Sequence, residues 1–360
     1  MQSTALRCTL FVLVATVQGV LGANSRQPLG VFNLLPTLRG SPANSSLQPA
    51  RVSTASSASS PADHSWVEIL SWHPRAFLYH NFLTQEECNH VVEVAKPQMR
   101  RSTVVGGDGK SVQDNIRTSY GTFLRRLQDP VVERIERRLE SWTMLDLVHQ
   151  EDMQILRYTD GQKYGAHYDS LPDKSPRIMT VLMYLGTTNL TGGETAFPEG
   201  SVWLDPEGEL RHGPFSECAK GHVAVRPKKG DALLFYSLKP DGGQDPTSMH
   251  TGCPTLTGVK WTATKWIHTK PFNPEWLKQG AKEPDQTPED CDDRNKECPD
   301  WAGKGECDKN PSYMKGDSFS LGNCRLSCSL CTVCKQDDNE CRQDNRMRAG
   351  FLPILANDVV

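Results

Sequence analysis

Residues 260–268 are Lys-Trp-Thr-Ala-Thr-Lys-Trp-Ile-His, and the period-two pattern of this stretch predicts a β-strand. Successive side chains of a strand point to opposite faces. One face therefore carries Lys260, Thr262, Thr264, Trp266 and His268, and the other carries Trp261, Ala263, Lys265 and Ile267. If Lys260 faces the interior, Lys265 faces away from it. An inward lysine needs an anion, because an unpaired buried charge is costly.

Further short apolar stretches precede this strand. Residues 178–185 form a long apolar run that predicts a strand buried on both faces. Turn residues such as Gly192-Gly193 and Gly230-Asp231 separate the other predicted strands. These strands are expected at 66–72, 77–83, 117–124, 153–158, 194–197, 222–225 and 232–236.

Two helices are expected before most of these strands. Thr84 and Glu87 form a capping box for the first helix, which ends before Pro97. Asp129-Pro130 begins the second helix, whose apolar residues follow helical spacing. Because no helices alternate with the later strands, a parallel α/β sheet is not expected. The pattern predicts an α+β fold, a jelly-roll (double-stranded β-helix) core flanked by N-terminal helices.

A candidate metal site lies in the strand-rich region. On a strand, His167 and Asp169 point to one face, and His250 from another strand completes a set of two histidines and one carboxylate. Such a set suits non-haem Fe(II), because it leaves the other side of the metal open. Lys260 offers a fixed cation for a carboxylate. Taken alone, a hydrogen-bonded structural His–Asp pair and a surface lysine would explain the same residues.

The ordered set of motifs resembles the prolyl 4-hydroxylase branch of the Fe(II)/2-oxoglutarate dioxygenases, above all the plant and green-algal type. The resemblance covers roughly residues 66–270. The matching stretches are Arg117-Thr-Ser-Tyr-Gly121, Arg157-Tyr158, Gly161-Gln-Lys-Tyr164, His167-Tyr-Asp169, Gly192-Gly-Glu-Thr195, Gly230-Asp-Ala232, Phe235-Tyr-Ser-Leu238, His250 and 260–268.

The resemblance implies the role of each site residue. It implies His167, Asp169 and His250 as iron ligands and as catalytic residues together with Lys260. It places Lys260, Tyr158 and Thr180 at the 2-oxoglutarate site, and Tyr164, Arg177, Trp266 and His268 near the peptide substrate. It also implies O2 as cosubstrate and ascorbate as the reductant of the iron.

The resemblance implies 4-hydroxylation of peptidyl proline, coupled to decarboxylation of 2-oxoglutarate to succinate and CO2, as in procollagen-proline 4-dioxygenases. We expect the substrates to be proline-rich secretory or cell-wall glycoproteins. A lysyl hydroxylase of the same superfamily, an inactive proline-rich-peptide binding protein and an interaction protein built on the C-terminal module are the alternatives. Arg177 and His268 also fit a salt-bridged arginine and a satisfied core histidine.

The N-terminus indicates entry into the secretory pathway. Residues 1–23 have the apolar run of a signal peptide, with a signal anchor as the alternative, and residues 24–64 form a Ser/Ala/Pro-rich stem expected to be disordered. The sequons at Asn44 and Asn189 are then candidate glycosylation sites. We expect a protein of the endoplasmic reticulum or Golgi lumen, either soluble or anchored once, and favour a monomer.

Composition and charge bear on the possible partners of the protein. The chain of 360 residues has 40 Lys+Arg, 43 Asp+Glu and a net charge of −3, so the basic stripe typical of proteins that bind nucleic acids is not expected.

The Gly-rich segment 102–116 is interpreted either as a lid over the site or as a plain hairpin connection.

Most of the 12 cysteines lie near the C-terminus, which indicates a disulfide-rich module in an oxidising compartment. After a linker at 271–289, residues 290–331 resemble the ShK toxin-like domain. That family's pattern implies the pairs Cys291–Cys331, Cys298–Cys324 and Cys307–Cys328. A zinc site near Cys328 ranks lower. Cys218 could pair with Cys253 and Cys334 with Cys341, Cys88 is expected in the core, and the tail at 332–360 lacks a clear structural signal beyond residue 342.

Overall fold

The computed structural model describes residues 64–102, 104–105, 111–112, 118–170, 175–200, 202–278, 287–317, 320–335 and 337–354. All of them belong to one unit, residues 58–360. The predicted signal segment, the stem, the Asn44 sequon and Arg117 lie outside the described residues. No helix in the described part of the chain is long and apolar enough to cross a membrane.

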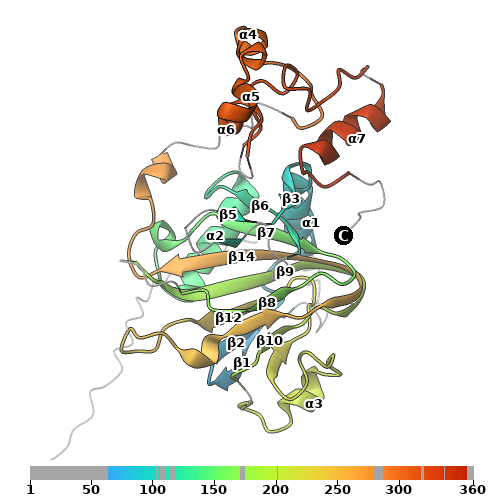
Figure 1. The fold of residues 1–360 in the computed structure, drawn as a ribbon. Helices are drawn as coiled ribbons and strands as arrows, with labels where there is room; N and C mark the ends of the chain where they lie inside the picture. The colour runs from blue at the N-terminus through green and yellow to red at the C-terminus, as the bar shows by residue number, and fades with distance from the viewer. Residues whose placement is uncertain are drawn as a thin grey trace, which may run out of the picture. The chain divides into compact units, whose positions relative to one another are not determined.

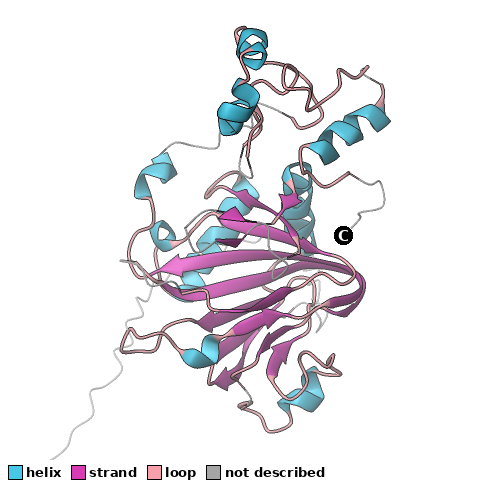
Figure 2. Ribbon diagram, viewed as in Figure 1, coloured by secondary structure: helices cyan, strands magenta, loops and turns pink. Residues whose placement is uncertain are grey.

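The strands lie together at the centre of the fold, with helices beside them, as Figures 1 and 2 show. The strands are β1 (Trp66–Trp72), β2 (Arg75–His80), β3 (Arg100–Arg101), β4 (Val104–Val105), β5 (Ser111–Val112), β6 (Tyr120–Leu124), β7 (Met153–Tyr158), β8 (Tyr164–His167), β9 (Arg177–Gly192), β10 (Thr195–Phe197), β11 (Val223–Val225), β12 (Ala232–Tyr236), β13 (His250–Gly252) and β14 (Thr255–His268). The α-helices are α1 (Gln85–Ala95), α2 (Pro130–Thr143), α3 (Gly208–His212), α4 (Cys298–Gly303), α5 (Glu306–Lys309), α6 (Pro311–Met314) and α7 (Asn339–Arg348). Short 3₁₀ helices lie at Lys96–Gln98, Leu147–His149, Pro246–Ser248 and Pro274–Lys278.

Two antiparallel sheets form the centre of the fold. The larger has the strand order β1-β2-β12-β9-β14-β7-β6-β3, and the smaller has the order β11-β10-β13-β8. β14 is hydrogen-bonded between β9 and β7, so the strand quoted above lies at the middle of the larger sheet. The antiparallel, sheet-rich core agrees with the sequence prediction.

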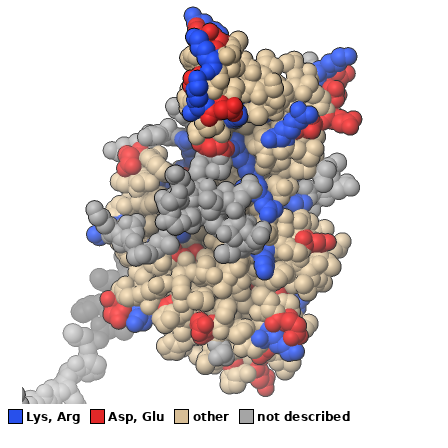
Figure 3. Space-filling model, viewed as in Figure 1, with Lys and Arg blue, Asp and Glu red and all other residues tan. Residues whose placement is uncertain are grey.

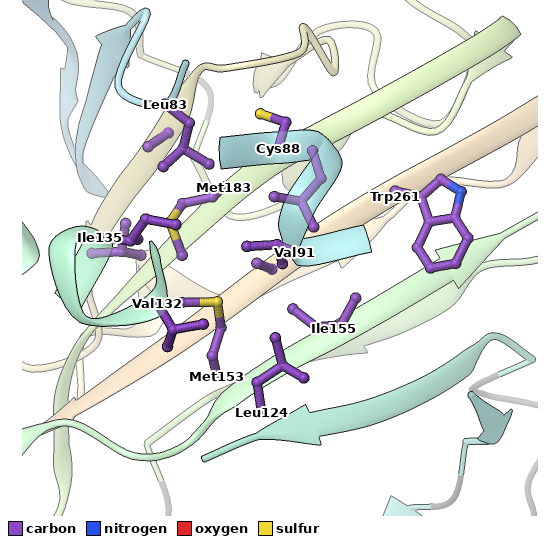
Figure 4. Close-up of a cluster of buried hydrophobic side chains, with 14 of the residues drawn as sticks. Leu83, Cys88, Val91, Leu124, Val132, Ile135, Met153, Ile155, Met183 and Trp261 are labelled. Atoms are coloured by element: carbon purple, nitrogen blue, oxygen red, sulfur yellow. The ribbon is translucent and has the colours of Figure 1, made fainter. Parts of the chain in front are cut away.

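Within β9, the segment 178–185 is buried on both faces, as the apolar run predicted, whereas the end of the strand is more exposed. Val181 and Met183 point to the side covered by α1 and α2, where they join the main hydrophobic core. Figure 4 shows this core, with Val91 of α1 and Ile135 of α2 against the strands. On the other face, Tyr184 packs in a second core between the two sheets.

Local signals set the helix starts. Thr84 accepts a hydrogen bond from Glu87 N, and Glu87 accepts one from Thr84 N, which is the predicted capping box. Asp129 caps α2 through Val131 N and Val132 N. Strand β2 ends at His80 rather than at residue 83, because Asn81 adopts φ 55° and donates its N–H to Asp231.

Segment 102–116 is described only in part. β4 and β5 pair antiparallel, with Val104 opposite Val112 and Val105 opposite Ser111, which matches the hairpin interpretation for these residues. The rest of the segment lies outside the described residues, and the lid role stays a prediction.

Five disulfides lie within the described residues. Cys218–Cys253 lies in the sheet region, and the C-terminal module contains Cys291–Cys331, Cys298–Cys324 and Cys307–Cys328, the pairing that the ShK-like resemblance implied. Cys334 pairs with Cys341, and Cys88 is free and buried.

The surface of the module carries both signs of charge. Figure 3 shows Lys/Arg and Asp/Glu side chains interspersed over α4 to α7. Lys304 pairs with Asp300, and Lys315 pairs with Asp308.

Residues after 342, which had no clear signal in the sequence, include most of helix α7 and two buried residues, Phe351 and Leu352. The helix is polar, so its apolar periodicity is weak. It is held instead by Arg346, fully buried, whose guanidinium donates to Glu289, Pro97 O and Leu352 O. These contacts join segments far apart in the sequence, so local pattern could not reveal them.

Candidate active site

A cavity lies between the two sheets. Both sheets contribute to its lining. The lining residues are Gln154, Leu156, Tyr158, Tyr164, His167, Asp169, Thr180, Leu182, Thr195, Phe235, His250, Gly252, Lys260, Thr262, Thr264 and Trp266. Alternate residues of β14 line it, from Lys260 to Trp266, while Trp261, Ala263 and Ile267 join the core on the opposite face. The predicted face assignment of this strand is therefore confirmed.

His167, Asp169 and His250 converge in this cavity. β13 pairs with β8 so that His250 lies directly opposite His167, and the two ring centroids are 4.3 Å apart. The Asp169 carboxylate is 3.5 Å from His167 Nε2 through Oδ1 and 3.6 Å from His250 Nε2 through Oδ2. The three ligand atoms lie within 4.8 Å of one another. Two imidazole nitrogens and a carboxylate at this spacing fit a transition metal.

The surroundings leave the correct atoms free for a metal. His167 Nδ1 lies 2.8 Å from Gly165 O, and His250 Nδ1 lies 3.0 Å from Ser248 O, so each Nδ1 donates to a carbonyl and each Nε2 faces the cavity. Thr180 donates to Asp169 Oδ2 at 2.6 Å, which orients the carboxylate.

Burial and charge set the protonation of the same cluster. Burial, reinforced by the neighbouring His167, lowers the pKa of His250 to about 4. Burial by itself would raise the pKa of Asp169, but the neighbouring His250 and His167 hold this pKa well below its usual range. At neutral pH the cluster thus offers a neutral imidazole and an ionised carboxylate, as metal binding requires.

Lys260 lies at the other end of the cavity and is only 2% exposed. Its Nζ donates to Gly193 O at 2.8 Å and lies 4.5 Å from the centroid of the ring of Tyr158, its partner residue on β7. Gly192 has φ 70° and its position leaves no room for a Cβ, which would come within 2.5 Å of Pro254 O.

Burial dominates the electrostatics of Lys260. It lowers the pKa of Lys260 to about 8, although Glu194 acts in the opposite direction. A buried ammonium facing a cavity without a paired carboxylate is a site for an anion.

Arg177 and His268 do not line the cavity, but they lie beside it and share one partner, Glu151. Arg177 donates to both Glu151 oxygens, at 2.5 and 3.1 Å, and His268 Nε2 lies 2.7 Å from Glu151 Oε1. The Arg177 guanidinium stacks 4.0 Å over the Trp266 ring, and its Nη1 lies 3.4 Å from Asp169 O. Burial would raise the pKa of Glu151, but the hydrogen bond from His268 and the charge of Arg177 lower it.

Sequence reasoning missed Glu151, which lies just before the 153–158 strand and matches no quoted motif. It also missed Gln154 and Leu156 on the cavity lining, although their alternation with core residues along β7 was a usable signal. The residues that were predicted for the iron, cosubstrate and peptide sites all lie on the cavity lining or beside it.

Comparison with known proteins agrees with this geometry. Residues 153–268 match the 2OG-Fe(II) oxygenase superfamily. Prolyl 4-hydroxylase 2 of Arabidopsis thaliana is 45% identical over 284 residues, covering 77% of this chain and 91% of that protein. Probable prolyl 4-hydroxylase 7 of the same plant is 44% identical over 277 residues, covering 75% and 84%.

Among solved structures, a viral collagen prolyl hydroxylase from Paramecium Bursaria Chlorella virus-1, in complex with 2OG, aligns with a TM-score of 0.40 and 22% identity. The alignment covers 54% of this chain and 96% of that one. Because the plant relatives exceed 40% identity over most of their own length, the chain belongs to the prolyl 4-hydroxylases of the 2OG-Fe(II) oxygenase superfamily.

Proposed function

We propose that this enzyme hydroxylates C4 of proline residues in a polypeptide, with 2-oxoglutarate and O2 as cosubstrates. The observation that carries the proposal is the convergence of His167, Asp169 and His250 in one cavity with the buried Lys260, in a chain of this family. Iron bound by the three ligands would supply the oxidation, coupled to decarboxylation of 2-oxoglutarate to succinate and CO2. Ascorbate would keep the iron reduced.

The cosubstrate would lie between the metal ligands and Lys260. Lys260 would bind its distal carboxylate, a charge-assisted contact that is strong in a buried site, and Tyr158 would hydrogen-bond the same group. Thr180 would contribute to the cosubstrate site indirectly, because it orients the carboxylate of the metal ligand Asp169. Lys260 and the metal ligands line the same cavity, so one small dicarboxylate could reach both ends.

The peptide would lie on the Trp266 side. An apolar pyrrolidine ring suits the aromatic surfaces of Trp266 and Tyr164. The Trp266 indole N–H is buried and has no hydrogen-bond partner within the described ranges. Arg177 and His268, held by Glu151, would orient the backbone beside it.

We also propose the setting of the enzyme. Five disulfides fit an oxidising compartment, so we place it in the endoplasmic reticulum or Golgi lumen, soluble or anchored once, acting as a monomer on proline-rich glycoproteins. We interpret the two sheets as a double-stranded β-helix and the Cys291–Cys331 module as an ShK-like domain that binds substrate or a partner protein.

In that compartment Asn189 would carry an N-linked glycan. The sequon Asn189-Leu190-Thr191 lies on β9, both Asn189 and Thr191 are exposed, and Asn189 adopts φ 48°. Peptide-N-glycosidase should release one glycan more from wild type than from N189Q, whatever Asn44 carries. A T191S variant, which preserves the sequon, should keep the glycan, whereas an unmodified wild-type Asn189 would refute this assignment.

The function is tested by incubating the protein with Fe(II), 2-oxoglutarate, ascorbate and a poly-proline-type peptide and mapping added oxygen by mass spectrometry. We expect one oxygen per modified proline and an equal yield of succinate. Oxygen on lysine would instead show a lysyl hydroxylase, and peptide binding without added oxygen would show an inactive binding protein.

A further inference from the structure

A buried ion pair behind β14 connects helix α2 to the residues proposed to hold the peptide. Lys265 and Glu136 are both fully buried, and Lys265 Nζ donates to Glu136 Oε1 at 2.6 Å. Lys265 faces away from the cavity, as the alternation of 260–268 predicted. It enters the core under α2 rather than solvent, and it is ion-paired with a carboxylate, whereas the cavity-facing Lys260 forms no ion pair within the described part of the chain.

The same ammonium also binds the main chain of residue 151. Lys265 Nζ donates to Glu151 O, and Glu151 N donates to Trp266 O at 2.9 Å. Gln150 forms a bridge with Ile267 and donates its side-chain amide to Glu136 O. The backbone at 150–151 is therefore attached to β14 and to α2 at once.

The side chain of Glu151 binds two residues that we propose to orient the peptide. Its two oxygens hold Arg177 and His268, and Arg177 stacks on Trp266 and approaches Asp169 O. A shift of the Glu151 backbone would thus move a guanidinium, an imidazole and an indole together.

We infer that the Lys265–Glu136 pair is a positioning device for the peptide site, acting through Glu151, and this inference rests on the proposed function. Stability alone does not require the pair, since well-packed apolar residues often replace a buried ion pair at no cost. An apolar residue at 265, however, would leave Glu151 O without the donor that fixes its place. Lysine thus provides what packing cannot, a hydrogen bond to one carbonyl from inside the core.

The test is the double variant K265M/E136Q. It removes both charges together, so no buried ion is left unpaired, and the amide oxygen introduced at position 136 can still accept the hydrogen bond that Leu127 N donates to Glu136. We expect the KM for a proline-rich peptide to rise by about three- to thirtyfold, the range for coupling through packed networks. The kcat at saturating peptide and the KM for 2-oxoglutarate should stay within about twofold of wild type.

A matched control is R138M/E87Q, which removes an ion pair between α2 and α1 away from β14. This control should lower the thermal midpoint without changing the peptide KM. Calorimetric titration of the peptide into the Mn(II)-substituted protein should show the same loss of affinity for K265M/E136Q alone.

Two failures are distinguishable. If wild type hydroxylates the peptide and K265M/E136Q keeps its peptide KM and affinity, the pair has only a structural role and the inference is wrong. If wild type adds no oxygen to any proline peptide, the proposed function itself fails.

Discussion

Replacing Lys260 by methionine should make the protein more stable and at the same time impair cosubstrate binding. Burial lowers the pKa of Lys260 from 10.5 to about 8, which corresponds to a cost of about 3 kcal/mol for keeping its charge in the folded state at neutral pH. Methionine removes that cost but leaves Gly193 O without its donor, which costs about 1–3 kcal/mol. The net expectation for K260M at pH 7 is a gain of about 1 kcal/mol in the free energy of unfolding.

The pH dependence isolates this effect. Between pH 8 and 10.5 the unfolded state holds the Lys260 proton more tightly than the folded state, so this residue makes wild-type stability rise with pH in that window. K260M lacks this contribution, while all other titrating groups are shared. The difference in unfolding free energy, wild type minus K260M, should therefore rise by about 3 kcal/mol across the window in urea titrations.

Cosubstrate binding should change in the opposite direction. Loss of a buried, hydrogen-bonded charge partner costs about 2–5 kcal/mol, so the affinity of the Mn(II)-substituted protein for 2-oxoglutarate should fall at least about thirtyfold. A difference in stability that stays flat from pH 8 to 10.5, or an unchanged affinity for 2-oxoglutarate, would refute the assignment of Lys260 as an uncompensated anion-binding cation.

Three further predictions concern other parts of the molecule. H250A should abolish turnover and lower Mn(II) affinity by about ten- to a hundredfold or more, measured by electron paramagnetic resonance, and retained activity would remove His250 from the ligand set. The double variant C218S/C253S should lose about 4 kcal/mol of unfolding free energy in urea, because this disulfide closes a loop with a sequence separation of 35, and an unchanged midpoint would contradict this. The hydrogen bond to Asp231 helps raise the pKa of His80 to about 9. The stability that protonated His80 gives the fold is therefore fully present below pH 6.5 and is lost as pH rises through 9. H80Q should therefore lower stability by up to about 3 kcal/mol at about pH 6 and much less at about pH 10, and an equal loss at both values would argue against a charged His80.

Much of the site could be predicted because its residues follow local rules. The alternation along 260–268 placed Lys260 and Trp266 on one face. His167 and Asp169 do converge, but β8 ends at His167, so the bend after the strand, and not strand alternation, brings Asp169 to the site. Side-chain direction on a strand is a property of the backbone itself, so it needs no knowledge of distant residues. The capping box at Thr84 is local in the same sense.

What only the tertiary structure decided is the choice of partners across long separations. Lys265 meets Glu136, Glu151 gathers Arg177 and His268, and Arg346 reaches Pro97, pairs that span from 26 to 249 positions. Each depends on strand register and helix placement, which the whole fold sets. The sequence alone thus determined which face of strand 260–268 carries chemistry, because period two is a local property. Which buried charge is neutralised and which stays open to a ligand was decided by packing, because Glu136 lies behind β14 and no carboxylate pairs with Lys260 among the described residues.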